Sequence, residues 1–286
     1  MSKVIVVTGT ASGLGKATVE KFAAEGWNVV ATVRKEADLK VHNENVRTLL
    51  LDVDDEEAAP GFAQEALAQF GRVDALVNNA GSYTMGPVEA TTMDQAHRQF
   101  QTNFFGLIAI TRAFLPIFRE QRSGVVVNIA SIAAEQSSPY HAVYSASKAA
   151  VVSLSESLNI EMEEFGVRVR AVLPGQHATA IFTKIDQADA PEDYQVGIKR
   201  FFSGVSRRGS APEVTAEVVL QAVLDPRFAP VRYHSGPDSA AIPRAKQILG
   251  QQQYWEEFRA AAGGRPSALW RTLMAAPGEH EFERAV

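Results

Sequence analysis

Short runs of β-branched and other apolar residues alternate along this chain with longer segments in which apolar residues recur at helical spacing. The short runs are Val4–Val7, Val29–Val33, Val46–Leu51, Ala75–Val77, Val125–Ile129 and Val167–Leu173. The helical segments include Leu14–Glu25, Glu56–Phe70, Met93–Arg119 and Ala142–Phe165. Apolar strands that alternate with helices predict a parallel sheet covered on both sides. Right-handed crossovers then give an α/β fold, a Rossmann-like doubly wound sheet with helices on both faces.

The pattern becomes less regular after the last of these strands, which Pro174-Gly175 is expected to end. A helix is predicted over Ala211–Leu224 and a final strand over Val231–Ser235. We therefore expect a single domain over residues 1–236, with residues 237–286 as a C-terminal extension of it.

Composition excludes several classes of protein. Of the 286 residues, 46% are hydrophobic, which allows a large core and excludes general disorder. The absence of cysteine excludes disulfides and thiolate chemistry, and the six histidines have no metal-binding spacing, so no metal is expected. With 28 basic and 33 acidic residues the net charge is −5, which does not favour nucleic acid. The longest apolar run, Phe104–Ile110, is too short to cross a membrane, and we expect a cytoplasmic protein.

A glycine-rich turn joins the first predicted strand to the first predicted helix. It has the sequence Thr8-Gly9-Thr10-Ala11-Ser12-Gly13-Leu14-Gly15, in which the glycine spacing is G-x-x-x-G-x-G. A helix N-terminus presents unpaired N–H groups and a partial positive charge, and glycines let a pyrophosphate approach the backbone. A tight connection alone could need these glycines, but their position at the start of a doubly wound pattern favours dinucleotide binding.

The residues after the second predicted strand bear on which dinucleotide binds. In such folds a carboxylate near the end of this strand holds the ribose hydroxyls of NAD. Here the strand is followed by Arg34 and Lys35, and a basic side chain suits the 2′-phosphate of NADP(H). NAD(H) stays open, because both charges could be solvated and Glu36 could serve a ribose.

Four polar residues form a second group. Tyr144 and Lys148 are spaced i, i+4 on a predicted helix, so the ammonium can approach the phenol. A nearby positive charge lowers the pKa of a tyrosine from about 10 toward neutrality, as a general acid or base at a carbonyl or alcohol carbon requires. Ser131 closes a predicted strand, and Asn103 lies in the preceding long helix.

Taken together, these motifs resemble the short-chain dehydrogenase/reductase family over about residues 3–236. The matching motifs are, in chain order, Thr8-Gly9-x-x-x-Gly13-x-Gly15, Asp52, Asn78-Asn79-Ala80-Gly81, Asn103, Ser131, Tyr144-x-x-x-Lys148 and Pro174-Gly175 with Thr179. The resemblance implies an NADP(H)-dependent oxidoreductase that interconverts a carbonyl and an alcohol, both small molecules. The alternatives are an NAD-preferring alcohol dehydrogenase and a non-catalytic cofactor-sensing protein, which would typically have lost Tyr144 or Lys148.

The resemblance also implies a role for each matching residue. Tyr144 would be the proton donor and acceptor, Lys148 would bind the nicotinamide ribose, and Ser131 would hydrogen-bond the substrate oxygen. Asn103 would hold a water in a proton relay with Lys148. Ser12 stands where some NADP-dependent members have a basic residue. The residues implied for the cofactor are Gly9, Thr10, Ser12, Gly13, Leu14, Gly15, Arg34, Asp52, Val53, Asn78, Ala80, Gly81, Tyr144, Lys148, Pro174, Gly175 and Thr179.

In this family a lid, here at about residues 178–210, covers the substrate. Its residues Phe182, Phe201, Phe202 and Val205 suit an apolar substrate or dock the lid on the core. His141 is a candidate substrate contact or an exposed residue at a helix start. His177 is either a further polar substrate contact or a harmless departure from the family pattern. The family's usual interface helix predicts a homodimer or homotetramer through Val151, Val152, Leu154, Leu158 and Ile160. We expect the extension to pack over the substrate side or to favour a dimer.

Overall fold

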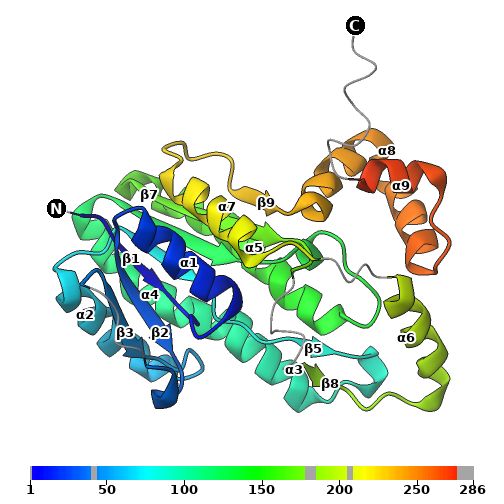
Figure 1. The fold of residues 1–286 in the computed structure, drawn as a ribbon, viewed down its shortest axis with the longest axis horizontal. Coiled ribbons are helices and arrows are strands. Elements are labelled where there is room, and N and C mark those ends of the chain that lie inside the picture. Colours follow the sequence, from blue (N-terminus) through cyan, green and yellow to red (C-terminus); the bar gives the residue numbers. More distant parts are fainter. Residues whose placement is uncertain (1, 40–43, 178–184, 205–208, 276–286) are drawn as a thin grey trace, which may run out of the picture.

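The computed structural model describes residues 2–39, 44–177, 185–204 and 209–275. Its centre is a seven-stranded sheet in the order β3-β2-β1-β4-β6-β7-β9, in which every neighbouring pair is parallel (Figure 1). The strands are β1 Val4–Val7, β2 Asn28–Val33, β3 Val46–Leu50, β4 Ala75–Asn78, β6 Gly124–Ile129, β7 Val167–Pro174 and β9 Arg232–Ser235. This confirms the predicted doubly wound sheet. The strand order reverses between β1 and β4, where such folds bind ligands at the carboxyl ends of the strands.

Helices cover both faces of the sheet. Successive side chains of a strand point to opposite faces, and here the side chains on both faces are apolar. Ile5 and Val7 pack in the same cluster as residues of α1 and α7, whereas Val6 packs with residues of α2, α4 and α5. Figure 1 shows α1 and α7 side by side on one face. The helices are α1 Gly13–Ala24, α2 Ala59–Phe70, α3 Met93–Phe100, α4 Gly106–Gln121, α5 Ala142–Met162 and α7 Pro212–Leu224.

The long helix predicted from Met93 is interrupted by a π-helical turn. Thr92 and Gln95 form a capping box at the start of α3, which fixes where the helix begins. Residues Gln101–Phe105 then make the π-helical turn before α4. Such turns are frequent at functional sites, and Asn103 lies within this one.

The structure contains elements that the sequence pattern did not predict. β5 Thr84–Met85 and β8 Asp186–Gln187 pair as a small second sheet, and α6 spans Glu192–Gly204. The extension forms α8 Pro237–Ala262, which kinks at Gly250, and α9 Ala268–Met274. These two helices lie beyond β9 at one end of the molecule (Figure 1). They share a small core made by Ile242, Ala245, Tyr254, Phe258, Trp270 and Leu273.

The apolar residues of α5 only partly form the free face expected of an interface helix. Val151, Val152 and Leu158 are at most 7% exposed, so they belong to this chain's own core, which corrects that part of the prediction. Leu154 packs partly buried against the same core, whereas Ile160 is 72% exposed. Among the helices of the described residues, none has the length and apolar character that a membrane crossing needs.

Candidate active site

The glycine-rich turn is held in place by both neighbouring strands. Thr10 donates from its backbone N and from Oγ1 to the carbonyl of Thr32 at the end of β2, over 2.8 and 3.0 Å. On the other side, Asn79 Nδ2 donates to the carbonyls of Thr8 and Gly9 over 2.8 and 2.9 Å. Sequence reasoning placed Asn79 in a motif but gave it no role. Its signal was the position directly after β4, beside the turn.

The start of α1 has backbone donors that no side chain satisfies. Ser12 is the N-cap residue with an extended backbone, yet its side chain makes no capping hydrogen bond, and the first turn has no acidic residue. N–H groups in this position favour an anionic ligand. Gly15 lets this backbone come close, because a Cβ there would collide with the Gly9 carbonyl and the Asn79 amide. The turn therefore fits a pyrophosphate group.

The ends of β2 and β3 place opposite charges beside each other. Arg34 is exposed directly after β2, and exposed Asp52 and buried Val53 follow β3. Burial raises the pKa of Asp54, while the nearby Arg34 charge partly opposes this effect. Arg34 therefore lies near the loop after β3, where the adenosine end of a dinucleotide bound at the turn would lie.

Asn78 serves the interior rather than the turn. It is 4% exposed, and its Nδ2 donates to Thr111 Oγ1 over 2.9 Å and to Asn128 Oδ1 over 2.8 Å. These bonds join β4 to α4 and β6. The side chain thus anchors the end of β4, whereas the neighbouring Ala80 packs against Gly9 of the glycine-rich turn.

The four catalytic candidates meet at the carboxyl ends of β4 and β6. Ser131 follows β6, and its hydroxyl lies close enough to the Tyr144 phenol to lower the pKa of that phenol. The buried Lys148 Nζ donates to the Ile129 carbonyl over 2.8 Å. A Cβ built on Gly81 would lie 3.2 Å from Asn103 Oδ1 and 3.7 Å from Lys148 Nζ. Both polar groups therefore converge on Gly81, next to the glycine-rich turn.

Asn103 is held by several protein groups. It is 1% exposed, its Oδ1 accepts from Ser82 N over 2.8 Å, and its Nδ2 donates to Ser147 Oγ over 3.2 Å. The π-helical turn aims this side chain at the site. A water relay between Asn103 and Lys148 stays a prediction.

The chain matches the family model for short chain dehydrogenases over residues 3–190. It belongs to this family. A solved short-chain dehydrogenase from Streptomyces avermitilis is 33% identical with a TM-score of 0.78, and the match covers 91% of this chain and 97% of that one. A short chain dehydrogenase from Burkholderia cenocepacia in complex with NADP is 27% identical with a TM-score of 0.71, over 86% and 93%. The 3-ketoacyl-(acyl-carrier-protein) reductase of Brucella melitensis, complexed with NADH, is 26% identical with a TM-score of 0.67, over 78% and 93%.

The family and the site together make this dehydrogenase an NAD(P)-dependent oxidoreductase with a nicotinamide cofactor. The family model ends at residue 190, so the extension lies outside it. In the part of the chain that the structure describes, no group of three His, Asp or Glu side chains could hold a metal ion.

Burial is the main influence on the electrostatics of Tyr144. Burial raises the pKa of its phenol, and the hydrogen bond with Ser131 opposes this to a smaller extent. The Lys148 ammonium donates to the Ile129 carbonyl over 2.8 Å, and its effect on the phenol stays a prediction. Burial lowers the pKa of Lys148 itself to about 8. Ser131 therefore favours the phenolate against the effect of burial.

Replacing Lys148 by Met is expected to stabilise the fold at pH 7. The lowered pKa means that burying the charged lysine costs about 3 kcal/mol, while losing the hydrogen bond to Ile129 costs about 1 kcal/mol. The free energy of unfolding should rise by about 1–2 kcal/mol. Chemical denaturation measures it. The difference should shrink between about pH 8 and 10.5, as Lys148 loses its proton in the folded wild type. A Lys148→Met protein that is less stable at pH 7 would contradict this account.

Aromatic side chains lie beside the Tyr144 phenol, and sequence reasoning missed one of them. The ring of buried Tyr83 lies edge-on to Tyr144 at 4.7 Å between centroids, and 5.5 Å from His141. Phe201 of α6 lies 5.6 Å from the His141 ring. His141 is thus partly buried rather than exposed, and Phe201 docks α6 beside the site. Tyr83 could have been suspected only from its place two residues after Gly81.

The structure describes His177 but only part of the predicted lid. His177 is 8% exposed and lies 2.9 Å from the Gly175 carbonyl and 2.6 Å from Thr215 Oγ1, so it joins β7 to α7. Thr179, Phe182 and Val205 lie outside the described residues, as does the side chain of Phe202.

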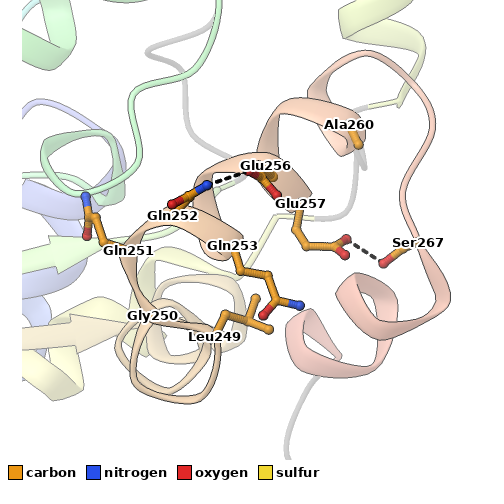
Figure 2. A pocket seen from close by; sticks show the side chains of 9 residues that line it. All are labelled: Leu249, Gly250, Gln251, Gln252, Gln253, Glu256, Glu257, Ala260 and Ser267. Carbon is orange, nitrogen blue, oxygen red and sulfur yellow. Dashed lines mark hydrogen bonds between the residues drawn. The ribbon is translucent and has the colours of Figure 1, made fainter.

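A hollow of about 670 Å³ lies in the extension (Figure 2). It is lined by Leu249, Gly250, Gln251, Gln252, Gln253, Glu256, Glu257, Ala260 and Ser267. Its polar groups partly satisfy one another, since Gln252 donates to Glu256 and Ser267 donates to Glu257. None of the four catalytic candidates lines it. A second hollow of about 290 Å³ beside α1 includes Thr10 and Ala11 of the glycine-rich turn.

Proposed function

We propose that this dehydrogenase interconverts a carbonyl and a primary or secondary alcohol with NADP(H), using Tyr144 as general acid and base. The observation that carries the proposal is the convergence of Tyr144, Ser131 and Lys148 beside the glycine-rich turn. A hydroxyl and a phenol that lie close together form a pair of donors suited to one carbonyl oxygen. The substrate is a small molecule, and the Tyr83 ring, which lies edge-on to Tyr144 and beside the His141 ring, favours an apolar group beside its carbonyl.

The protein's residues supply position and proton transfer. Ser131 donates a hydrogen bond to the carbonyl oxygen, and the Tyr144 phenol gives that oxygen a proton as the alcohol forms. Lys148 then holds a positive charge near the phenolate and lowers the energy of that form. The bound nicotinamide supplies or accepts the hydride at the substrate carbon. The unsatisfied donors of α1 and the glycines at positions 9 and 15 would hold its pyrophosphate.

NADP(H) is the proposed cofactor because exposed Arg34 follows β2 and no carboxylate stands at the strand end. NAD(H) is the alternative, and relatives of known structure include one bound to each. Assembly into a homodimer or homotetramer also belongs to this proposal, supported by the exposed Ile160 of α5. The cytoplasmic location stays a prediction.

Arg34→Ala is expected to weaken NADPH binding about 10-fold, because a charge-assisted hydrogen bond contributes about 1.5–3 kcal/mol. NADH binding should change less than twofold, since NADH has no 2′-phosphate. Fluorescence titration of both reduced cofactors measures the two affinities. Arg119→Ala, at an exposed position of α4, is the control for loss of one positive charge. Unchanged NADPH affinity in Arg34→Ala would exclude this residue as the phosphate contact.

A further inference from the structure

A buried carboxylate lies four residues after Ser131. Glu135 follows the single 3₁₀ turn Ile132–Ala134, and its side chain is only 8% exposed. Its Oε1 lies 2.9 Å from Arg232 Nη1 and 3.4 Å from His234 Nε2, and its Oε2 lies 3.7 Å from Lys246 Nζ. A buried carboxylate needs such partners. Three groups from β9 and α8 thus hold one residue of the loop after β6.

The backbone and flanking side chains of this loop are held by the same extension. Lys246 Nζ also donates to the carbonyl of Glu135 over 2.9 Å. The Tyr254 hydroxyl donates to the side chain of Gln136. Ile132 packs against the small core of α8 and α9. Three residues of this loop, Ile132, Glu135 and Gln136, therefore contact the extension.

A continuous hydrogen-bonded turn connects Glu135 to Ser131. Ser131 Oγ accepts from Ala133 N over 3.1 Å, and Glu135 N donates to the Ile132 carbonyl over 3.0 Å. With so short a segment, a shift at Glu135 moves the Ser131 hydroxyl. Catalytic groups must stay within about 0.5 Å of their productive position, so this coupling matters for the rate.

Helix α8 is a firm support because its first turn is fixed to the sheet. Asp238 accepts a hydrogen bond from Gln176 N over 2.7 Å, and Ser239 Oγ donates to the Leu173 carbonyl over 2.7 Å. The Asp238 carboxylate also fills the space that a Cβ on Gly175 would occupy. The extension thus links the end of β7 to the loop after β6.

We propose that Glu135 is a positioning residue for Ser131, held in place by Arg232, His234 and Lys246. The extension then serves the reaction by fixing the substrate-oxygen donor. The inference rests on the proposed function of Ser131. In support, the pKa of Glu135 is lowered to about 2, with the His234 ring as the largest cause and Arg232 next among the groups that lower it. The carboxylate therefore stays ionised at any ordinary assay pH.

A double-mutant cycle tests this coupling. Glu135→Gln is expected to lower kcat about 10-fold with less than twofold change in the KM for NADPH, since a displaced hydroxyl loses one hydrogen bond to the reacting oxygen. In a Ser131→Ala background the same change should lower kcat less than twofold, because the group that Glu135 positions is gone. Glu156→Gln is the matched control. It removes another carboxylate partner of Arg232, 2.7 Å away on α5, and should keep wild-type kcat.

The outcomes separate this inference from the proposed function. An equal kcat loss from Glu135→Gln in both backgrounds, or no loss in either, would overturn the positioning role while Ser131 chemistry stands. Lys246→Met is the substitute variant if Glu135→Gln does not fold. Its kcat loss should be smaller than that of Glu135→Gln, and it should likewise largely vanish in the Ser131→Ala background. A wild-type protein with no turnover of any carbonyl would overturn the proposed function and this inference together.

Discussion

Tyr144→Phe is expected to lower kcat for carbonyl reduction by roughly 10²–10⁴-fold, the usual contribution of a positioned general acid. The phenylalanine keeps the ring that packs against Tyr83 but has no proton to give to the substrate oxygen. NADPH affinity should stay within about threefold of wild type, because the glycine-rich turn is unchanged. Steady-state rates of NADPH oxidation with a panel of ketones and aldehydes measure kcat.

Tyr233→Phe is the matched control for losing a phenol. Its hydroxyl donates to Asp225 over 2.9 Å, and this pair lies outside the candidate site. Full activity is expected in this variant. A Tyr144→Phe protein that turns over at the wild-type rate would remove Tyr144 from its proposed role.

Gly15→Ala is expected to weaken NADPH binding about 100-fold, since overpacking a close contact costs about 1–3 kcal/mol. The added Cβ would collide with the carbonyl of Gly9 and with the Asn79 amide that holds the turn. Both groups have to move, and the N–H donors of α1 move with them. Fluorescence titration with NADPH measures the loss.

Gly61→Ala is the control, because this glycine also lies in a helix but has open space around it. It should bind NADPH normally and be more stable by about 0.5–1 kcal/mol, as alanine is favoured over glycine in a helix. Wild-type NADPH affinity in Gly15→Ala would contradict the assignment of the turn as the pyrophosphate site.

The central sheet could be predicted because its strands are short, apolar and mostly β-branched. β1 starts and ends where the sequence placed it, and the other predicted strands differ by one or two residues. The extension could not be predicted in the same way. α8 has no continuous apolar stripe, contains Pro243, and kinks at Gly250 where φ is 70°. Its stability comes from contacts with α9 and with the loop after β6.

The candidate site, too, could be predicted from the sequence only in part. Tyr144 and Lys148 could be found because one helix sets their spacing, and Ser131 because it follows a strand. The raised pKa of Tyr144 could not be predicted, since it depends on how deeply the folded chain buries the phenol. The role of Glu135 could not be predicted from the sequence either. Its partners Arg232 and Lys246 lie about a hundred residues further along the chain, and nothing local indicates that they meet.

Hydride transfer is tested most directly with NADPH that carries deuterium at both C4 positions. The protein is incubated with the ketone or aldehyde that it reduces fastest, and the alcohol is analysed by mass spectrometry and NMR. Our account predicts one deuterium on the carbinol carbon of the product, and almost none formed by Tyr144→Phe. An alcohol without deuterium, or no oxidation of the cofactor with any carbonyl, would contradict it.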